Sequence, residues 1–133
     1  MEPSATIKSA DDATRLIFFD ASGESFTAAL ESAQFSGRVL VSTYHSGPPS
    51  LLFENMARQW RGWEGEKQWA ALEDELRLTA SSDLTGHIEL TVAMRDYSSP
   101  ADWGLRATLR LEAGQLEEMA RAVKKVFQHV QII

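Results

Sequence analysis

The amino-acid sequence predicts a single domain of the α+β class, in which two helices pack on one face of a mainly antiparallel sheet of about six strands. The chain has 133 residues, a length that suits one hydrophobic core. Several segments alternate apolar with polar residues, as strands with one buried face do, and two others repeat apolar residues at helical spacing. We therefore expect the order β-β-β-α-β-β-β-α over residues 1–133, with residues 1–5 frayed.

Three strands are expected before the first helix. The first spans residues 14–20, where Leu16 to Phe19 are apolar without alternation, as in a strand that is covered on both faces. Residues 25–31 fit either an alternating strand or one face of a helix. We favour the strand, because residues 38–44 follow as a clear β segment with which it can pair.

The first helix is expected to begin at Leu51, with Ser50 as its N-cap, and to stop at Gly62. Its apolar residues recur three or four positions apart, which is the spacing of one buried helix face. We expect this face to lie in the core. It consists of Leu52, Phe53, Met56, Ala57, Trp60 and Trp63.

Three more strands and a second helix complete the predicted fold. Apolar and polar residues alternate over residues 75–80, 87–95 and 105–112, and helical spacing continues over residues 116–130. The last helix has acidic residues near its start and lysines near its end, as the helix dipole favours. This is the most regular pattern in the chain.

The last three predicted strands share a strongly charged face. A hairpin centred near Asp83 would place Arg77 opposite Glu89 on this face. The face fits either a basic groove for an anion or a solvated surface with cross-strand ion pairs. Its charged residues are Arg77, His87, Glu89, Arg95, Arg106 and Arg110.

Composition excludes several functional classes. The chain has 19 acidic and 13 basic side chains and a net charge of -6, which argues against a general nucleic-acid binder. The whole excess of acid lies in residues 1–75. The absence of Cys excludes disulfides and thiolate metal sites. We expect a cytoplasmic protein with no membrane association, because neither a signal peptide nor a membrane-spanning segment is visible.

The search for catalytic and metal-binding motifs points to no enzyme, no metal and no cofactor. His45, His87 and His129 are scattered, and none has a second ligand at a familiar metal-binding spacing. Asp83 lies four residues before His87, so the two could act as an oriented general base. The alternative is that the pair only stabilises the loop before a strand.

The most unusual segment is a tryptophan-rich block, residues 60–69. Three of the four Trp of the chain lie here, with glycines and charged residues between them. Trp63 could fold back over the helix end and Trp69 could begin the next strand beneath it; exposed indoles would instead mark a binding site. We take as candidate binding residues Arg61, Trp63, Glu64, Lys67, Trp69, His87, Arg106 and Arg110.

Three motifs carry a family resemblance. They are W-R-G-W at residues 60–63 followed by Gly65, Lys67 and Trp69; Gly86-His87 at a strand start; and L-E-A-G-Q-L-E at residues 111–117. Over about residues 25–128 the chain resembles an uncharacterised bacterial domain-of-unknown-function family, a resemblance that implies little about activity. By size and charge it is also similar to small bacterial proteins that include toxin-neutralising immunity proteins.

These observations leave three hypotheses about function. The first is a non-enzymatic interaction domain, in the manner of an immunity protein, that binds a protein partner. The second is a small-molecule binder or enzyme with a pocket near Arg61, Trp63, Trp69, Asp83 and His87. The third is a homodimer that covers the apolar residues 16–19 and the terminal Ile132 and Ile133.

Overall fold

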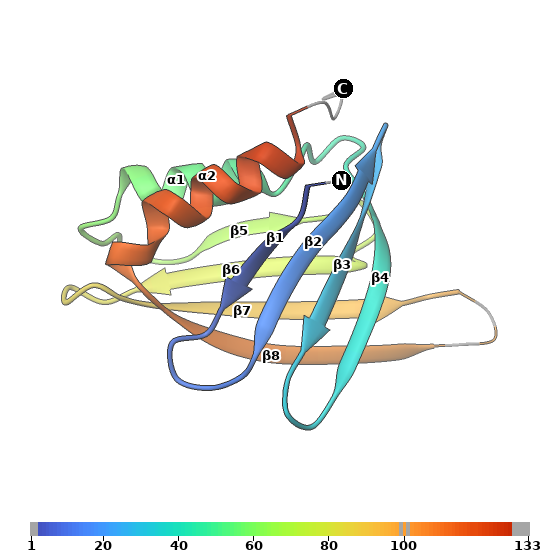
Figure 1. Ribbon diagram of the computed structural model, residues 1–133, viewed down its shortest axis with the longest axis horizontal. Helices are drawn as coiled ribbons and strands as arrows, with labels where there is room; N and C mark the ends of the chain where they lie inside the picture. The colour runs from blue at the N-terminus through green and yellow to red at the C-terminus, as the bar shows by residue number, and fades with distance from the viewer. Residues whose placement is uncertain (1–2, 99, 101, 129–133) are drawn as a thin grey trace.

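The protein is built from two four-stranded antiparallel sheets and two helices, in the order β-β-β-β-α-β-β-β-β-α (Figure 1). The computed structural model describes residues 3–98, 100 and 102–128. The predicted α+β class is confirmed. The predicted single sheet of six strands is wrong, because two short edge strands were missed and the strands divide between two sheets.

The first sheet is a meander in which each strand pairs with the next. The strand assignment of residues 25–31 is confirmed. The expectation that residues 1–5 fray is wrong at Ala5, which pairs with Phe18 and is 3% exposed; Met1 and Glu2 lie outside the described residues. The strands are β1 (Ala5–Lys8), β2 (Arg15–Ser22), β3 (Ser25–Glu31) and β4 (Ser36–Ser42).

The second sheet is also a meander, and its register differs from the expected one. Ser82 pairs with Ile88, so Arg77 lies opposite Ala93 and not Glu89. The turn is centred two residues later than expected, and because the shift is even, every side chain keeps its predicted face. The strands are β5 (Lys67–Ala70), β6 (Leu76–Ser82), β7 (His87–Asp96) and β8 (Trp103–Glu112).

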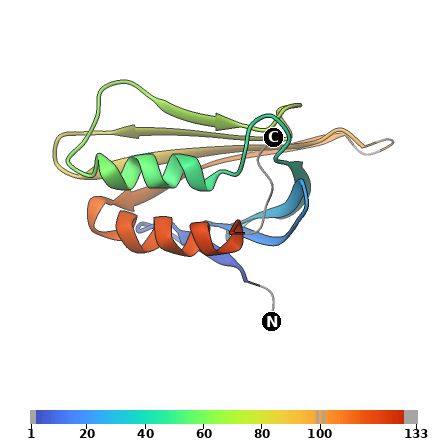
Figure 2. The ribbon, with the colours of Figure 1, turned by 90° about the horizontal axis from the view of Figure 1, so that it is seen from above.

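The helices α1 (Ser50–Arg58) and α2 (Leu116–Val126) lie side by side along the gap between the two sheets (Figure 2). Each follows one meander and lies beside the other, since α1 contacts β5 and α2 contacts β1. The predicted packing of both helices on one face of one sheet is therefore wrong. Within the described part of the chain, neither helix has the length and apolar character that crossing a membrane requires.

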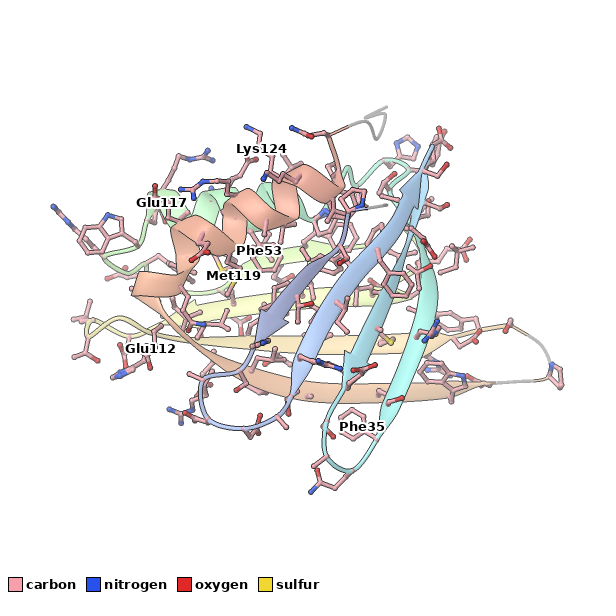
Figure 3. The ribbon with its side chains drawn as sticks, viewed as in Figure 1. Phe35, Phe53, Glu112, Glu117, Met119 and Lys124 are labelled. Atoms are coloured by element: carbon pink, nitrogen blue, oxygen red, sulfur yellow. The ribbon has the colours of Figure 1, made fainter. Side chains whose placement is uncertain are left out.

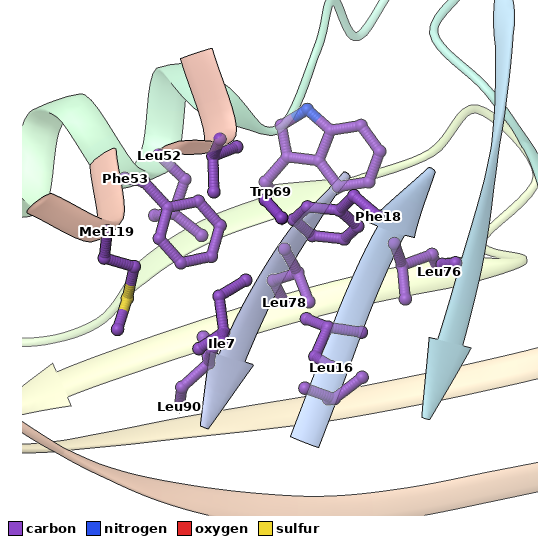
Figure 4. Packing of buried hydrophobic residues seen from close by; sticks show 14 of the residues in the cluster. Ile7, Leu16, Phe18, Leu52, Phe53, Trp69, Leu76, Leu78, Leu90 and Met119 are labelled. Carbon is purple, nitrogen blue, oxygen red and sulfur yellow. The ribbon is translucent and has the colours of Figure 1, made fainter. Parts of the chain in front are cut away.

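One hydrophobic core joins both sheets and both helices (Figure 4). At its centre Phe18 makes edge-to-face contacts with three other rings. The centroid distances are 5.5 Å to Phe26 on β3, 6.1 Å to Phe53 on α1 and 5.9 Å to Phe127 just after α2. Such geometry adds to the stabilisation from burial. The core therefore depends on aromatic rings that lie far apart in the sequence.

Side chains and loops cover one position on each of two sheet edges, β4 and β8. The Glu75 carboxylate accepts a hydrogen bond from the Ser42 N–H at 2.9 Å, at the end of β4. On β8, Arg110 donates its N–H to the Ser9 hydroxyl at 3.1 Å and accepts from the Ala10 N–H at 2.7 Å. These contacts occupy backbone groups that would otherwise be free to pair with another strand.

Strand β2 is covered fully on one face only. Leu16 and Phe18 are completely buried, whereas Ile17 and Phe19 on the opposite face are half-buried. The Arg38 guanidinium lies over the Phe19 ring, 5.6 Å from its centroid. The predicted cover on both faces of this strand is thus replaced by a cation-π contact on the outer face. The terminal Ile132 and Ile133, which a homodimer was expected to cover, lie outside the described residues.

We expect Phe18→Ala to lower the free energy of unfolding by about 3–5 kcal/mol, because it removes a fully buried ring that contacts three others. Its sequence neighbour Phe19 is the matched control, and Phe19→Ala should cost about 1 kcal/mol or less. Urea unfolding monitored by circular dichroism would measure both. Equal losses would contradict the inward and outward assignment of the two rings.

Candidate interaction surface

Helix α1 ends earlier than the sequence suggested, and this exposes Trp60. The helix stops at Arg58, and Gln59 already has non-helical dihedral angles. Trp60 is 53% exposed, so the expectation that it continues the buried helix face is wrong. The three- and four-residue spacing of apolar residues continues through Trp60. Such spacing places side chains on one face only within a helix, and the helix has already ended here.

Trp60 borders a hollow between the end of α1 and the start of α2. The Arg61 guanidinium stacks on the Trp60 indole at 5.1 Å from the ring centroid. This cation-π contact holds two large side chains together at the surface. The hollow has a volume of about 470 Å³, and it is lined by Ala57, Arg58, Trp60, Ala113, Gly114 and Glu117.

Trp63 is half-buried against the core, where it contacts β6 and Lys67; that it folds back over the end of α1 stays a prediction. Its indole N–H donates to the Ala80 carbonyl at 3.3 Å, and the Lys67 ammonium lies 5.0 Å from its ring centroid. Lys67 also donates to the side-chain oxygens of Asn55 and Gln59. Burial lowers the pKa of Lys67, and nearby Arg58 adds to the effect. Lys67 therefore links the start of β5, just after the loop, to α1 and the residue that follows it.

Trp69 belongs to the core. It lies in β5 beneath α1, is 6% exposed, and packs against Phe26 with 6.3 Å between ring centroids. Its indole N–H has no hydrogen-bond partner among the described residues. The structure thus places this candidate binding residue where it contributes packing.

Asp83 and His87 form a stabilised turn between β6 and β7. The Asp83 carboxylate accepts backbone N–H bonds from His87 at 3.0 Å and Thr85 at 2.8 Å, and these bonds hold its pKa well below its ordinary value. The His87 ring lies 3.2 Å from Asp83 and 3.7 Å from Glu112. All three side chains are about half exposed. The geometry fits loop stabilisation.

Distant segments of the chain meet at this end of the molecule. A Cβ on Gly62 would lie 3.1 Å from the Asp83 carbonyl oxygen, a tight contact, and the φ of 116° at this position also favours glycine, so glycine suits the close approach of the loop after α1 to the β6–β7 turn. Glu112 and Glu117 lie at the same end (Figure 3). Leu84, at the tip of the turn, is 91% exposed. We define the Trp60 end as Trp60, Arg61, Leu84, Glu112 and Glu117.

The sequence patterns singled out Trp60 and Arg61 but missed Leu84, Glu112 and Glu117 as site residues, and two of these three had a signal. Leu84 is an apolar residue in a predicted turn, and Glu117 opens a predicted helix. The remaining candidates Glu64 and Lys67 lie in and just after the loop that leads from α1 to β5. Of the original candidates, Arg61 is exposed and lies against the Trp60 ring.

Arg106 and Arg110 lie elsewhere, on the outer face of the second sheet. Arg110 pairs with Asp11 at 3.3 Å and with its cross-strand partner Glu89 at 3.8 Å. Arg106 has no carboxylate partner among the described residues. Arg110 therefore matches the interpretation of this face as cross-strand ion pairs, whereas Arg106 does not.

In the part of the chain that the structure describes, neither His45 nor His87 belongs to a group of ligands arranged to hold a metal ion. The described residues contain no group of three His, Cys, Asp or Glu side chains arranged to hold a metal ion. His45 stacks on Tyr44, with 4.1 Å between ring centroids. His129 lies outside the described residues.

We expect Asp83→Ala to destabilise the fold in a pH-dependent manner. Because the folded-state pKa is lowered, the carboxylate stabilises the fold fully above its ordinary pKa of 3.8, and this contribution is lost as the pH falls further. The stability difference between wild type and variant should thus shrink on acidification, as measured by thermal unfolding at a series of pH values. Glu66→Ala is the control, and a difference independent of pH would contradict the assignment.

Trp60 should account for most of the fluorescence that acrylamide quenches. Trp60→Phe removes the most exposed indole, so the remaining emission should be much less accessible to the quencher. Trp69→Phe, which removes a buried indole, should leave the quenchable fraction nearly unchanged. Unaltered quenching in Trp60→Phe would show that the indole is buried.

Comparisons with known proteins identify the family of the chain. Residues 7–130, nearly the whole length, match the model of a family of unknown function, DUF6228. Neither the comparison with curated proteins nor the comparison with solved structures found a match. The match to the family model agrees with the resemblance noted in the sequence, and the chain belongs to the DUF6228 family.

Proposed function

We propose that the protein is a non-enzymatic interaction domain that binds a basic protein partner through the Trp60 end. The observation that carries the proposal is the exposed Trp60 indole beside a surface hollow. An exposed tryptophan adds about 1.5–3 kcal/mol when a partner buries it, which is why tryptophan is common at binding hot spots.

The shape of the surface supports the proposal. The hollow has mostly small or apolar lining groups, so a partner side chain can enter it and cover the Trp60 ring. Arg61 already holds one face of the indole, which limits the side-chain entropy lost on binding. Leu84 supplies a second exposed apolar group at the same end.

Charge supports a basic partner. Glu112 and Glu117 belong to the Trp60 end, and Glu64 and Glu66 lie in the adjoining loop. These four carboxylates outnumber Arg58 and Arg61 beside the hollow, although Glu117 already pairs with Arg121 at 3.1 Å. Acidic groups around an aromatic anchor attract a basic partner and disfavour an acidic one. An immunity-type protein that covers a basic toxin in the bacterial cytoplasm is a narrower form of the same proposal, supported by size and charge alone.

The test is quantitative capture of partners from lysate. Wild-type protein should retain a partner that Trp60→Ala loses, with at least about a tenfold fall in affinity for loss of the anchor. The purified partner should bind more slowly to Glu64→Lys than to wild type, because its electrostatic attraction is reduced.

The control is Tyr44→Ala, which removes an exposed aromatic side chain before the start of α1. It should leave partner binding unchanged. Binding that survives both Trp60→Ala and Arg61→Ala would overturn the proposal. Light scattering of the purified protein separates it from the alternative of a homodimer, in which the partner is a second copy of the chain.

A further inference from the structure

Three arginines surround one small residue on the outer face of the second sheet. Arg77 on β6, Ala93 on β7 and Arg106 on β8 are direct cross-strand partners in one row. Arg95 follows Ala93 on the same face, and Gly104 lies opposite Arg95. Because Ala93 and Gly104 have little or no side chain, the surface between the three arginines is hollowed.

The structure has a hollow of about 310 Å³ at this place, lined among others by Asp74, Arg77, Ala93, Arg95, Gly104 and Arg106. Since neighbouring strands lie about 4.8 Å apart, the backbones of Arg77 and Arg106 are separated by about 10 Å. Both side chains can therefore bend over Ala93 and reach the same bound group. We call this hollow the arginine dish.

Two of the arginines are held in place by carboxylates. Arg77 pairs with Asp74 at 3.1 Å, and Arg95 pairs with Asp102 at 3.0 Å. The Arg95 guanidinium also lies 4.9 Å from the Tyr97 ring centroid. Arg106 has no such partner among the described residues. The dish thus has two positioned cations and one that is free to move onto a ligand.

The charge of the dish is opposite to that of the whole protein. Three guanidinium groups face two carboxylates here, whereas the chain carries a net charge of -6. The two carboxylates each offset one guanidinium, so Arg106 is the uncompensated positive charge beside the hollow, and the register keeps all three arginines on the same face. An anion that enters the hollow would offset this remaining charge.

We propose that the arginine dish binds a phosphate group. A guanidinium offers parallel N–H donors that match phosphate and carboxylate oxygens. A carboxylate has two oxygens, which can accept hydrogen bonds from one or two guanidinium groups. A phosphate monoester has three free oxygens, which can accept hydrogen bonds from three guanidinium groups. Arg77, Arg95 and Arg106 line one hollow from three strands, so a phosphate bound there could accept from more than one of them.

The experiment is a titration of the full chain with inorganic phosphate, followed by amide NMR at constant ionic strength. The amide signals of Ala93, Arg95, Gly104 and Arg106 should move together and saturate. Acetate should bind at least about tenfold more weakly, since it lacks the third oxygen. A phosphoserine peptide forms a second arm, and tighter binding than inorganic phosphate would identify a phosphorylated side chain as the source.

Matched variants locate the binding. Arg106→Gln should weaken phosphate affinity about tenfold, which corresponds to the loss of one charged hydrogen-bonding group. Arg110→Gln is the control, because Arg110 lies on the same strand and face but is already paired with Glu89 and Asp11. Ala93→Leu should also weaken binding, because it fills the dish without changing its charge.

Two outcomes would overturn the proposal. Equal weakening by Arg106→Gln and Arg110→Gln would mean that phosphate is attracted only by diffuse surface charge. No movement of the dish amides at millimolar phosphate would mean that there is no site. Trp60→Ala should leave phosphate binding unchanged, so the two surfaces are tested independently.

Discussion

The fold depends on the burial of Phe18 between the two sheets and the two helices. Neither sheet is closed by itself, and each has an apolar face that needs cover. The first sheet and both helices meet at Phe18. Its ring contacts Phe26 of the same sheet, Phe53 of α1 and Phe127 just after α2. Since close-packed interiors transmit small displacements, a change at Phe18 would be felt in β3 and at both helices.

Both candidate surfaces are consequences of that packing. Because α1 and α2 lie side by side over the gap, the end of one and the start of the other form the hollow beside Trp60. Because the inner face of the second sheet is occupied by the core, its alternating polar residues all point outward. The arginine dish is one part of that outer face.

Much of the fold could be predicted from the sequence because the periodic patterns are local. Both helices, and most of the six longer strands, follow directly from helical spacing or alternation. The four-residue strands β1 and β5 could not be recognised, because such a short segment contains too few alternations. Alternation also says which residues share a face but not which strands share a sheet, so the division into two sheets was missed.

The candidate site was harder to predict because its parts come from distant segments. The position of Trp60 depends on where α1 stops, and helix ends are the least certain feature of a helical pattern. The contact of Gly62 with the turn at Asp83 joins residues that no local pattern relates. Similarly, the row of Arg77, Ala93 and Arg106 exists only in the observed register, since pairing Arg77 with Glu89 would have neutralised it.

The exchange of helices between the two meanders has a consequence for how the chain holds together. A cut in the loop between Arg61 and Glu66 would leave one fragment with the first sheet and α1, and another with the second sheet and α2. Each fragment would carry the helix that lies beside the other fragment's sheet. We therefore expect that neither fragment can cover its apolar sheet face fully without the other.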